Sequence, residues 1–357
     1  MRFVIAAVMI GLAAQSAAQA QPSFPAPQPH DFIVKNFRFE SGETLPEVRL
    51  HYRTIGTPVR DAGGRIANAV LVMHGSSGDA GQVLNRSFTE PLLGPDGPLD
   101  ARKYFFIFPD LLGNGRSTKP SDGLRAKFPK YGYTDMVRLE HQLISEGLGI
   151  ARLKLVMGIS MGGMHAWMWG IRYPDAMEAI VAIAAMPVPV QGRNLLWRRI
   201  LAQAIRNDPE WKSGAYETPP EGFLSIMPMF DMLVQSPARL GESLKTYADA
   251  AKHLADVRDE TLEEDDANNI LYRFEASFDY NPEPDLDRIR APLMAILFED
   301  DELNPLNLGT MERVMPRVKG GRLVIVPTGP DTEGHRTQVK ASVWREHVRQ
   351  FMTTTLK

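Results

Sequence analysis

Apolar positions along the chain gather into short runs that are separated by amphipathic segments. Residues 47–54 (EVRLHYRT) alternate between polar and apolar side chains, which predicts a strand with one buried face. Continuous apolar runs predict strands that are covered on both faces, as in the middle of a parallel sheet. Such runs lie at residues 69–73, 104–108, 153–157, 179–184, 292–298 and 322–326.

Helical periodicity appears between these runs. Thr134 and Asp135 can cap a helix whose apolar residues recur at helical spacing, and a second helix follows residue 160. Pro174 ends that second helix because proline cannot continue it. A last helix covers residues 339–352. Strands that alternate with helices predict an α/β fold with a mainly parallel, doubly wound sheet.

The pattern changes in one long internal segment. Residues 188–288 are largely helical and polar, and predict a helical cap inserted after a central strand. The core is then formed by residues 31–187 and 289–357. Residues 21–30 (QPSFPAPQPH) are rich in proline and predict an extended leader before the core.

The first twenty residues predict a cleaved secretory signal peptide. Arg2 precedes an apolar run over residues 3–14, and Ala18 and Ala20 have the small-residue spacing of a cleavage site. The apolar run is shorter than the roughly 20 residues that span a membrane, and no later run is long enough. We therefore expect a periplasmic or secreted protein with no membrane span after cleavage.

Charge and cysteine content exclude several function classes. The net charge is −3, which provides no basic face for nucleic acid. The chain has no cysteine, which excludes disulfides, a cysteine nucleophile and thiolate metal sites. The lone G-x-G in LLGNGRS lacks the third glycine of a dinucleotide site. We expect neither a cofactor nor a metal.

The stretch MGISMGGMHAW, residues 157–167, carries the pattern G-x-S-x-G at Gly158, Ser160 and Gly162. Between a strand and a helix this pattern is the nucleophile elbow of serine hydrolases. The alternative is a serine in a glycine-rich turn that has no chemical role. Functional groups in α/β sheets gather at the carboxyl ends of strands. The residues at the other strand ends therefore indicate whether Ser160 is a nucleophile or a serine without a chemical role.

Two other strand ends carry the groups that a serine nucleophile needs. His335 follows the run at 322–326 and precedes the last helix, which is where a general base is expected. Glu299, Asp300 and Asp301 follow the run at 292–298, and each of the three could orient His335. The order serine, acid, histidine is that of α/β hydrolases.

An acyl-transfer site also needs two N–H donors for the developing oxyanion. The amide of Met161 is one candidate, since it directly follows Ser160 and begins a helix. The loop HGSSG at residues 74–78 is expected to supply the other, with Ser76 as the candidate. The alternative for that loop is a tight glycine turn alone.

Several stretches resemble the homoserine O-acetyltransferase branch of the α/β-hydrolase-fold proteins. They are LHYRTIGTP, NAVLVMHGSSGDA, DPEWKSGAY and, most specifically, residues 133–175 around the elbow. The resemblance extends over most of residues 45–350. It implies an acyl-enzyme on Ser160, the acid at Asp301 within DELNP and the base at His335. It also implies a helical lid and a homodimer joined through that lid.

Three stretches of the chain depart from this family. Gly75-Ser76-Ser77 stands where the family has Ala-Leu-Thr, and Asp110 stands where it has Asn. Met227 stands where the family has the arginine thought to hold the amino-acid carboxylate. A buried carboxylate without a cationic partner is costly to bind, which argues against homoserine as the acceptor.

These observations predict an exported serine hydrolase that cleaves a small acyl ester through Ser160, His335 and Asp301. Export supports hydrolysis, because acetyl-CoA is cytosolic and water then receives the acyl group. An acyltransferase similar to the homoserine O-acetyltransferases is the alternative. A non-catalytic binding protein of the same fold is a third hypothesis, against which the complete triad argues.

Overall fold

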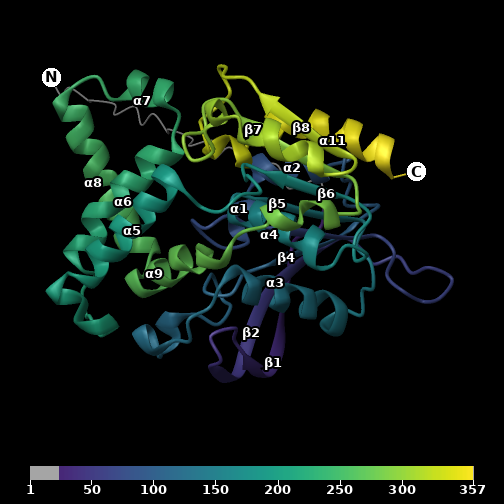
Figure 1. The fold of residues 1–357 in the computed structure, drawn as a ribbon, viewed down its shortest axis with the longest axis horizontal. Coiled ribbons are helices and arrows are strands. Elements are labelled where there is room, and N and C mark those ends of the chain that lie inside the picture. The colour runs from purple at the N-terminus through teal and green to yellow at the C-terminus, as the bar shows by residue number, and fades with distance from the viewer. Residues whose placement is uncertain (1–23, 357) are drawn as a thin grey trace, which may run out of the picture.

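The computed structural model describes residues 24–356, so the predicted signal peptide and residues 21–23 lie outside the described residues. Eight strands form one sheet in the order β1-β2-β4-β3-β5-β6-β7-β8 (Figure 1). β1 and β2 are antiparallel to their neighbours, and the other strands are parallel. The strands are β1 (Gln28–Arg38), β2 (Thr44–Ile55), β3 (Ala69–Met73), β4 (Phe105–Pro109), β5 (Leu155–Ile159), β6 (Ile180–Ile183), β7 (Leu293–Phe298) and β8 (Gly321–Val326).

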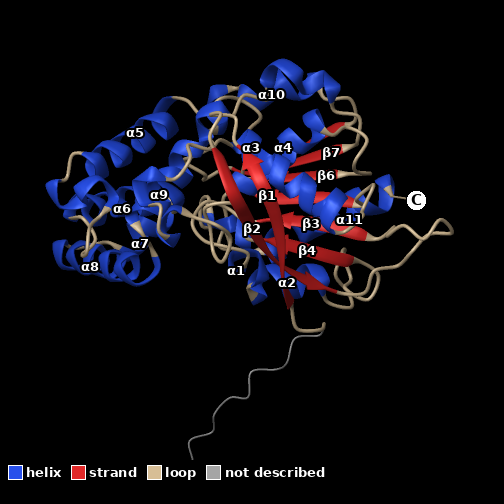
Figure 2. Ribbon diagram, turned by 90° about the horizontal axis from the view of Figure 1, so that it is seen from below, coloured by secondary structure: helices blue, strands red, loops and turns tan. Residues whose placement is uncertain are grey.

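Helices cover both faces of the sheet, which explains the continuous apolar runs. In β3, Val70 and Val72 belong to one buried cluster, whereas Leu71 and Met73 belong to the other. One face packs on α3, α4 and α10, and the other packs on α1, α2 and α11 (Figure 2). The bounds are α1 (Gly81–Leu84), α2 (Arg86–Leu93), α3 (Tyr133–Gln142), α4 (Met161–Arg172), α10 (Thr310–Val314) and α11 (Ala341–Thr355). The predicted α/β-hydrolase architecture is confirmed.

Some boundaries differ from the sequence prediction. β5 begins two residues late, because Leu153 instead forms an isolated bridge with Met177. The prediction that residues 322–326 are covered on both faces is wrong, because β8 is an edge strand and Ile325 is exposed. α3 begins at Tyr133, one residue before the predicted cap. The last residues of the predicted extended leader form part of a strand, since β1 begins at residue 28 and pairs with β2.

Five helices between β6 and β7 form a cap beside the sheet (Figure 1). They are α5 (Gly192–Arg206), α6 (Glu221–Val234), α7 (Pro237–Ser243), α8 (Tyr247–Glu264) and α9 (Ala267–Glu275). Trp197, Phe223 and Phe274 lie in the cap's own buried cluster. The end of the predicted cap segment packs on the core instead, where Tyr280 and Leu286 are buried. None of the helices in the described part of the chain is long and apolar enough to cross a membrane.

Candidate active site

Ser160 lies at the sharp turn between β5 and α4. Its backbone has φ 48° and ψ −115°, a conformation that non-glycine residues adopt mainly at functional turns. Glycines on either side make the turn possible. A Cβ atom at Gly158 would lie 2.0 Å from the carbonyl oxygen of Gly162, and one at Gly162 would lie 2.4 Å from that of Met73. The pattern G-x-S-x-G therefore has a steric cause here.

A continuous line of hydrogen bonds joins Ser160 to a carboxylate. Ser160 Oγ lies 2.8 Å from His335 Nε2, and His335 Nδ1 lies 2.7 Å from Asp301 Oδ2. Since Asp301 can only accept, His335 donates from Nδ1 and its Nε2 is left to accept the serine proton. His335 and Asp301 are buried, and Ser160 is half-buried. This arrangement can activate a serine hydroxyl as a nucleophile.

The structure separates the three adjacent acids that the residues alone left open. Glu299 Oε2 accepts a bond from the Thr328 amide at 2.8 Å, and Asp300 Oδ2 accepts one from the Gly334 amide at 3.0 Å. Asp301 alone of the three contacts the imidazole of His335. The acid position implied by the family resemblance is thus the one that lies beside the base.

Asn304 also holds this carboxylate, and the sequence reasoning missed it. Its Nδ2 donates to Asp301 Oδ2 at 2.8 Å and to the carbonyl oxygen of Ala184 at 3.0 Å. The Leu303 amide donates to Asp301 Oδ1 at 2.9 Å. Both carboxylate oxygens are therefore fixed by donors. The amide side chain within DELNP was the signal that could have indicated this partner.

The two expected oxyanion donors lie beside Ser160. Met161 is the first residue of α4, and Gly75 packs so closely that a Cβ atom there would lie 3.2 Å from Ser160 Cβ. The Gly75 amide is occupied, since it donates to Gln82 Oε1 at 2.7 Å. Among residues 24–356 nothing accepts a hydrogen bond from the backbone amides of Met161 and Ser76. These two amides can therefore donate to a ligand.

Two side chains, one nearby in the sequence and one distant, hold the loop that carries Ser76. Arg273 Nη1 donates to the Ser76 carbonyl oxygen at 2.9 Å, and Gln82 Nε2 donates to Ser77 Oγ at 3.0 Å. Arg273 belongs to α9 of the cap, so the cap helps to fix the loop. No sequence motif marks Arg273, because its contact depends on how the cap lies on the core.

His74 fixes the start of the same loop as a neutral imidazole. Its Nδ1 donates to the Gly75 carbonyl oxygen at 2.6 Å, and its Nε2 accepts from the Leu111 amide at 3.0 Å. Burial lowers the pKa of His74 from 6.5 to about 4.

The lowered pKa of His74 predicts a loss of stability in mild acid. Between pH 6.5 and about 4 the unfolded chain binds a proton at His74 that the folded chain excludes, so folding weakens as pH falls through this window. We expect His74 to account for about 2 kcal/mol of the fall in unfolding free energy between pH 7 and pH 5. Urea unfolding at both pH values measures this. His74→Gln should reduce the difference and His347→Gln should leave it unchanged; equal differences in all three proteins would contradict the assignment.

A cavity of about 360 Å³ lies between the cap and the Ser160–His335 pair. Met227 and Phe230 of α6 and Val257 of α8 are apolar residues that line it. Charged residues also line it, namely Asp231, Glu260, Glu264, Asp265, Glu333 and Arg336. The cap helices α6 and α8 therefore contribute both apolar and acidic side chains, and the carboxylates that line the cavity outnumber its one arginine.

The chain matches a family model described as "alpha/beta hydrolase fold" over residues 68–224. It is 32% identical over 291 residues to a probable acyltransferase of Methanothermobacter thermautotrophicus, covering 81% of this chain and 88% of the relative. It is 32% identical over 297 residues to a homoserine O-acetyltransferase of Trichormus variabilis, covering 75% and 79%. The solved structure of esterase E22 is similar with a TM-score of 0.79 at 19% identity, covering 92% of this chain and all of that one.

Fold and sequence similarity together define an enzyme of the α/β-hydrolase type. Within that class, the chain belongs to the α/β-hydrolase family that includes the homoserine O-acetyltransferases. The family resemblance predicted from the motifs is thereby confirmed.

Proposed function

We propose that this protein transfers an acyl group through a covalent ester on Ser160. The observation that carries the proposal is the hydrogen-bonded line from Asp301 through His335 to Ser160 Oγ, which opens into the cavity beneath the cap. His335 Nε2 takes the hydroxyl proton while Oγ attacks the acyl carbonyl carbon. The amides of Met161 and Ser76 donate to the carbonyl oxygen as it becomes negative.

The bond to the leaving group then breaks, and the proton on His335 passes to that group. This leaves the acyl group on Ser160 and returns His335 to its neutral form. In the second half, an acceptor hydroxyl gives its proton to His335 and attacks the acyl carbon. The acyl ester of the acceptor is released, and Ser160 Oγ recovers its proton from His335.

The acceptor distinguishes transfer from hydrolysis. The relatives that are named as acyltransferases support transfer to an organic hydroxyl better than they support the hydrolase that the sequence analysis placed first. We therefore propose transfer as the main reaction. Hydrolysis is the second candidate function, and export, proposed from residues 1–20, supports it because an exported enzyme lacks cytosolic acetyl-CoA.

The charges around the cavity argue against an amino-acid acceptor. At the position where the family has an arginine, Met227 lines the cavity. Arg336 is the one Arg or Lys among the described residues that line this cavity, and its guanidinium is paired with Asp231. Glu260 and Glu264 lie one helical turn apart on α8, and within the described chain no cation lies within ion-pair distance of either. An acceptor that carries a carboxylate would be repelled by these acidic side chains, whereas a neutral or positively charged alcohol would not.

The acceptor preference can be tested by product analysis with 4-nitrophenyl acetate as the acyl donor. L-homoserine, 2-aminoethanol and 1,2-ethanediol are offered in turn, and acetate and acetylated acceptor are quantified by mass spectrometry. We expect 2-aminoethanol and 1,2-ethanediol to be acetylated in preference to homoserine. Glu260→Gln/Glu264→Gln should lower the preference for 2-aminoethanol over 1,2-ethanediol about threefold or more, since two exposed charges each contribute modestly.

Glu263→Gln is the matched control, because Glu263 lies on the same helix and does not line the cavity. It should leave the acceptor preference unchanged. Homoserine as the best acceptor would contradict the argument from charge. If acetate is the sole product with every acceptor, the reaction is hydrolysis and not acyl transfer.

A further inference from the structure

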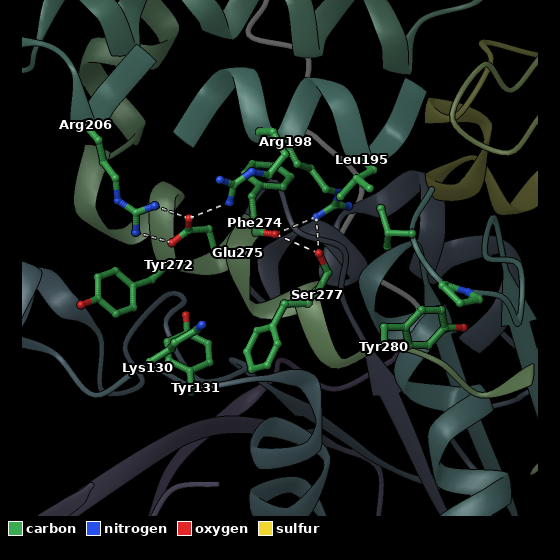
Figure 3. A pocket seen from close by; sticks show the side chains of 14 residues that line it. Lys130, Tyr131, Leu195, Arg198, Arg206, Tyr272, Phe274, Glu275, Ser277 and Tyr280 are labelled. Carbon is green, nitrogen blue, oxygen red and sulfur yellow. Dashed lines mark hydrogen bonds and ion pairs between the residues drawn. The ribbon is translucent and has the colours of Figure 1, made fainter. Parts of the chain in front are cut away.

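A second cavity, of about 610 Å³, lies where helix α5 of the cap meets the core. Arg198, Arg199 and Arg206 of α5 line it, together with Lys130 of the core and the end of α9. We call it the arginine pocket. Figure 3 shows arginine side chains on one side of the cavity and the rings of Tyr131, Tyr272 and Tyr280 on the other.

The arginine pocket is separate from the cavity at Ser160. The two cavities have no lining residue in common. An aromatic partition stands between them, in which Trp197 packs on Phe230 and Phe274 with ring centroids 4.8 and 4.7 Å apart. Phe230 faces the Ser160 cavity and Phe274 faces the arginine pocket. A ligand in one cavity therefore does not occupy the other.

Positive charge is in excess in the arginine pocket. Four cationic side chains line it, and the single carboxylate among the lining residues is that of Glu275. Arg206 binds Glu275 through both terminal nitrogens, and Arg199 Nη1 lies 3.8 Å from the same carboxylate. Lys130 stands over the ring of Phe278 at 4.5 Å from its centroid and, in the described chain, forms no ion pair.

Arg198 is the buried member of this group, with 9% of its surface exposed. Its guanidinium donates to neutral acceptors: Asn194 Oδ1 at 2.8 Å, the Phe274 carbonyl oxygen at 3.2 Å and Ser277 Oγ at 3.3 Å. No carboxylate of residues 24–356 lies within ion-pair distance of it. Burial lowers the pKa of Arg198, yet a guanidinium remains charged in a protein. A buried cation of this kind is stabilised by an anion that approaches from the cavity.

We propose that the arginine pocket binds a small anion that carries an aromatic ring. The cations supply charge-assisted hydrogen bonds to a phosphate or carboxylate. Among the rings opposite them, half-buried Tyr272 and Phe278, which is 60% exposed, supply an apolar surface for the ring. Buried Tyr131 stacks on Tyr272 with ring centroids 6.1 Å apart. Since core and cap both contribute, the bound anion bridges the two. The proposal does not depend on the reaction at Ser160.

Isothermal titration calorimetry with phenyl phosphate as the probe tests this proposal. We expect saturable binding to the full chain and to Ser160→Ala alike, with inorganic phosphate binding more weakly and benzyl alcohol not measurably. Lys130→Gln/Arg199→Gln should weaken the binding of phenyl phosphate at least about tenfold, because two charged donors are removed from exposed positions. Arg206 keeps its bond to Glu275 in this variant.

Arg193→Gln is the matched control, since Arg193 lies on α5 outside the arginine pocket and pairs with Glu302. It should bind phenyl phosphate as the unmodified chain does. The proposal is overturned if phenyl phosphate does not bind saturably, if Lys130→Gln/Arg199→Gln binds it as well as the unmodified chain, or if benzyl alcohol binds equally well. A lower mass of that double variant in light scattering would also overturn it, because a second copy of the chain would then cover the pocket.

Discussion

Ser160→Ala is expected to lower kcat/KM for 4-nitrophenyl acetate by at least about 10⁴-fold. The reason is that Ser160 Oγ receives the acyl group in the proposed reaction, and no other hydroxyl among the described residues is within hydrogen-bond distance of His335 Nε2. The substitution removes one hydrogen bond from a half-buried position, so the fold should persist. Steady-state kinetics and a thermal melt of the same sample measure both effects.

Ser77→Ala is the control for this experiment. Ser77 lines the same cavity, but its hydroxyl contacts Gln82 and not His335. We expect Ser77→Ala to keep kcat/KM within about tenfold of the unmodified enzyme, because the substitution removes only one hydrogen bond, the bond to Gln82. Activity that survives in Ser160→Ala, in a protein that melts normally, would exclude Ser160 as the nucleophile.

Asp301→Asn is expected to lower kcat by about 10³-fold or more. An asparagine amide that donates toward His335 Nδ1 stabilises the tautomer in which Nε2 carries the proton. The imidazole then cannot accept the proton of Ser160 Oγ from 2.8 Å away. The effect should appear mainly in kcat, because Asp301 does not line the cavity.

Asp300→Asn provides the sharpest comparison, because Asp300 is the neighbouring residue with the same side chain. Among the described residues its Oδ2 accepts only from the Gly334 amide, at 3.0 Å, and an asparagine oxygen can accept the same bond. We expect kcat to fall by less than about tenfold, the cost of weakening one hydrogen bond. A loss in Asp300→Asn that equals the loss in Asp301→Asn would reject Asp301 as the orienting acid.

The fold could be predicted largely from local pattern. Apolar runs marked the parallel strands because a strand covered on both faces needs apolar residues throughout. β1 was not predicted, since many of its side chains are exposed and its pairing with β2 gives no local signal. β8 was expected to be covered on both faces, because an apolar run does not show whether a strand lies at an edge.

Those residues of the candidate site could be predicted whose sequence motif implies a backbone turn or a position at a strand end. The glycines around Ser160 indicated a nucleophile elbow, and the position of His335 after the last strand indicated a general base. Among Glu299, Asp300 and Asp301, the residues alone could not choose, because a turn decides which side chain faces the base. Arg273 and the excess charge in the arginine pocket could not be predicted, since they depend on how the cap lies on the core.

The most direct test of the central claim is the site of reaction with a fluorophosphonate, which labels a serine that a neighbouring histidine activates. The labelled chain is digested and analysed by mass spectrometry while residual activity is followed. We expect one adduct per chain, located on Ser160, with activity lost in proportion to labelling. An adduct on another residue, or full activity after Ser160 is fully labelled, would contradict acyl transfer through Ser160.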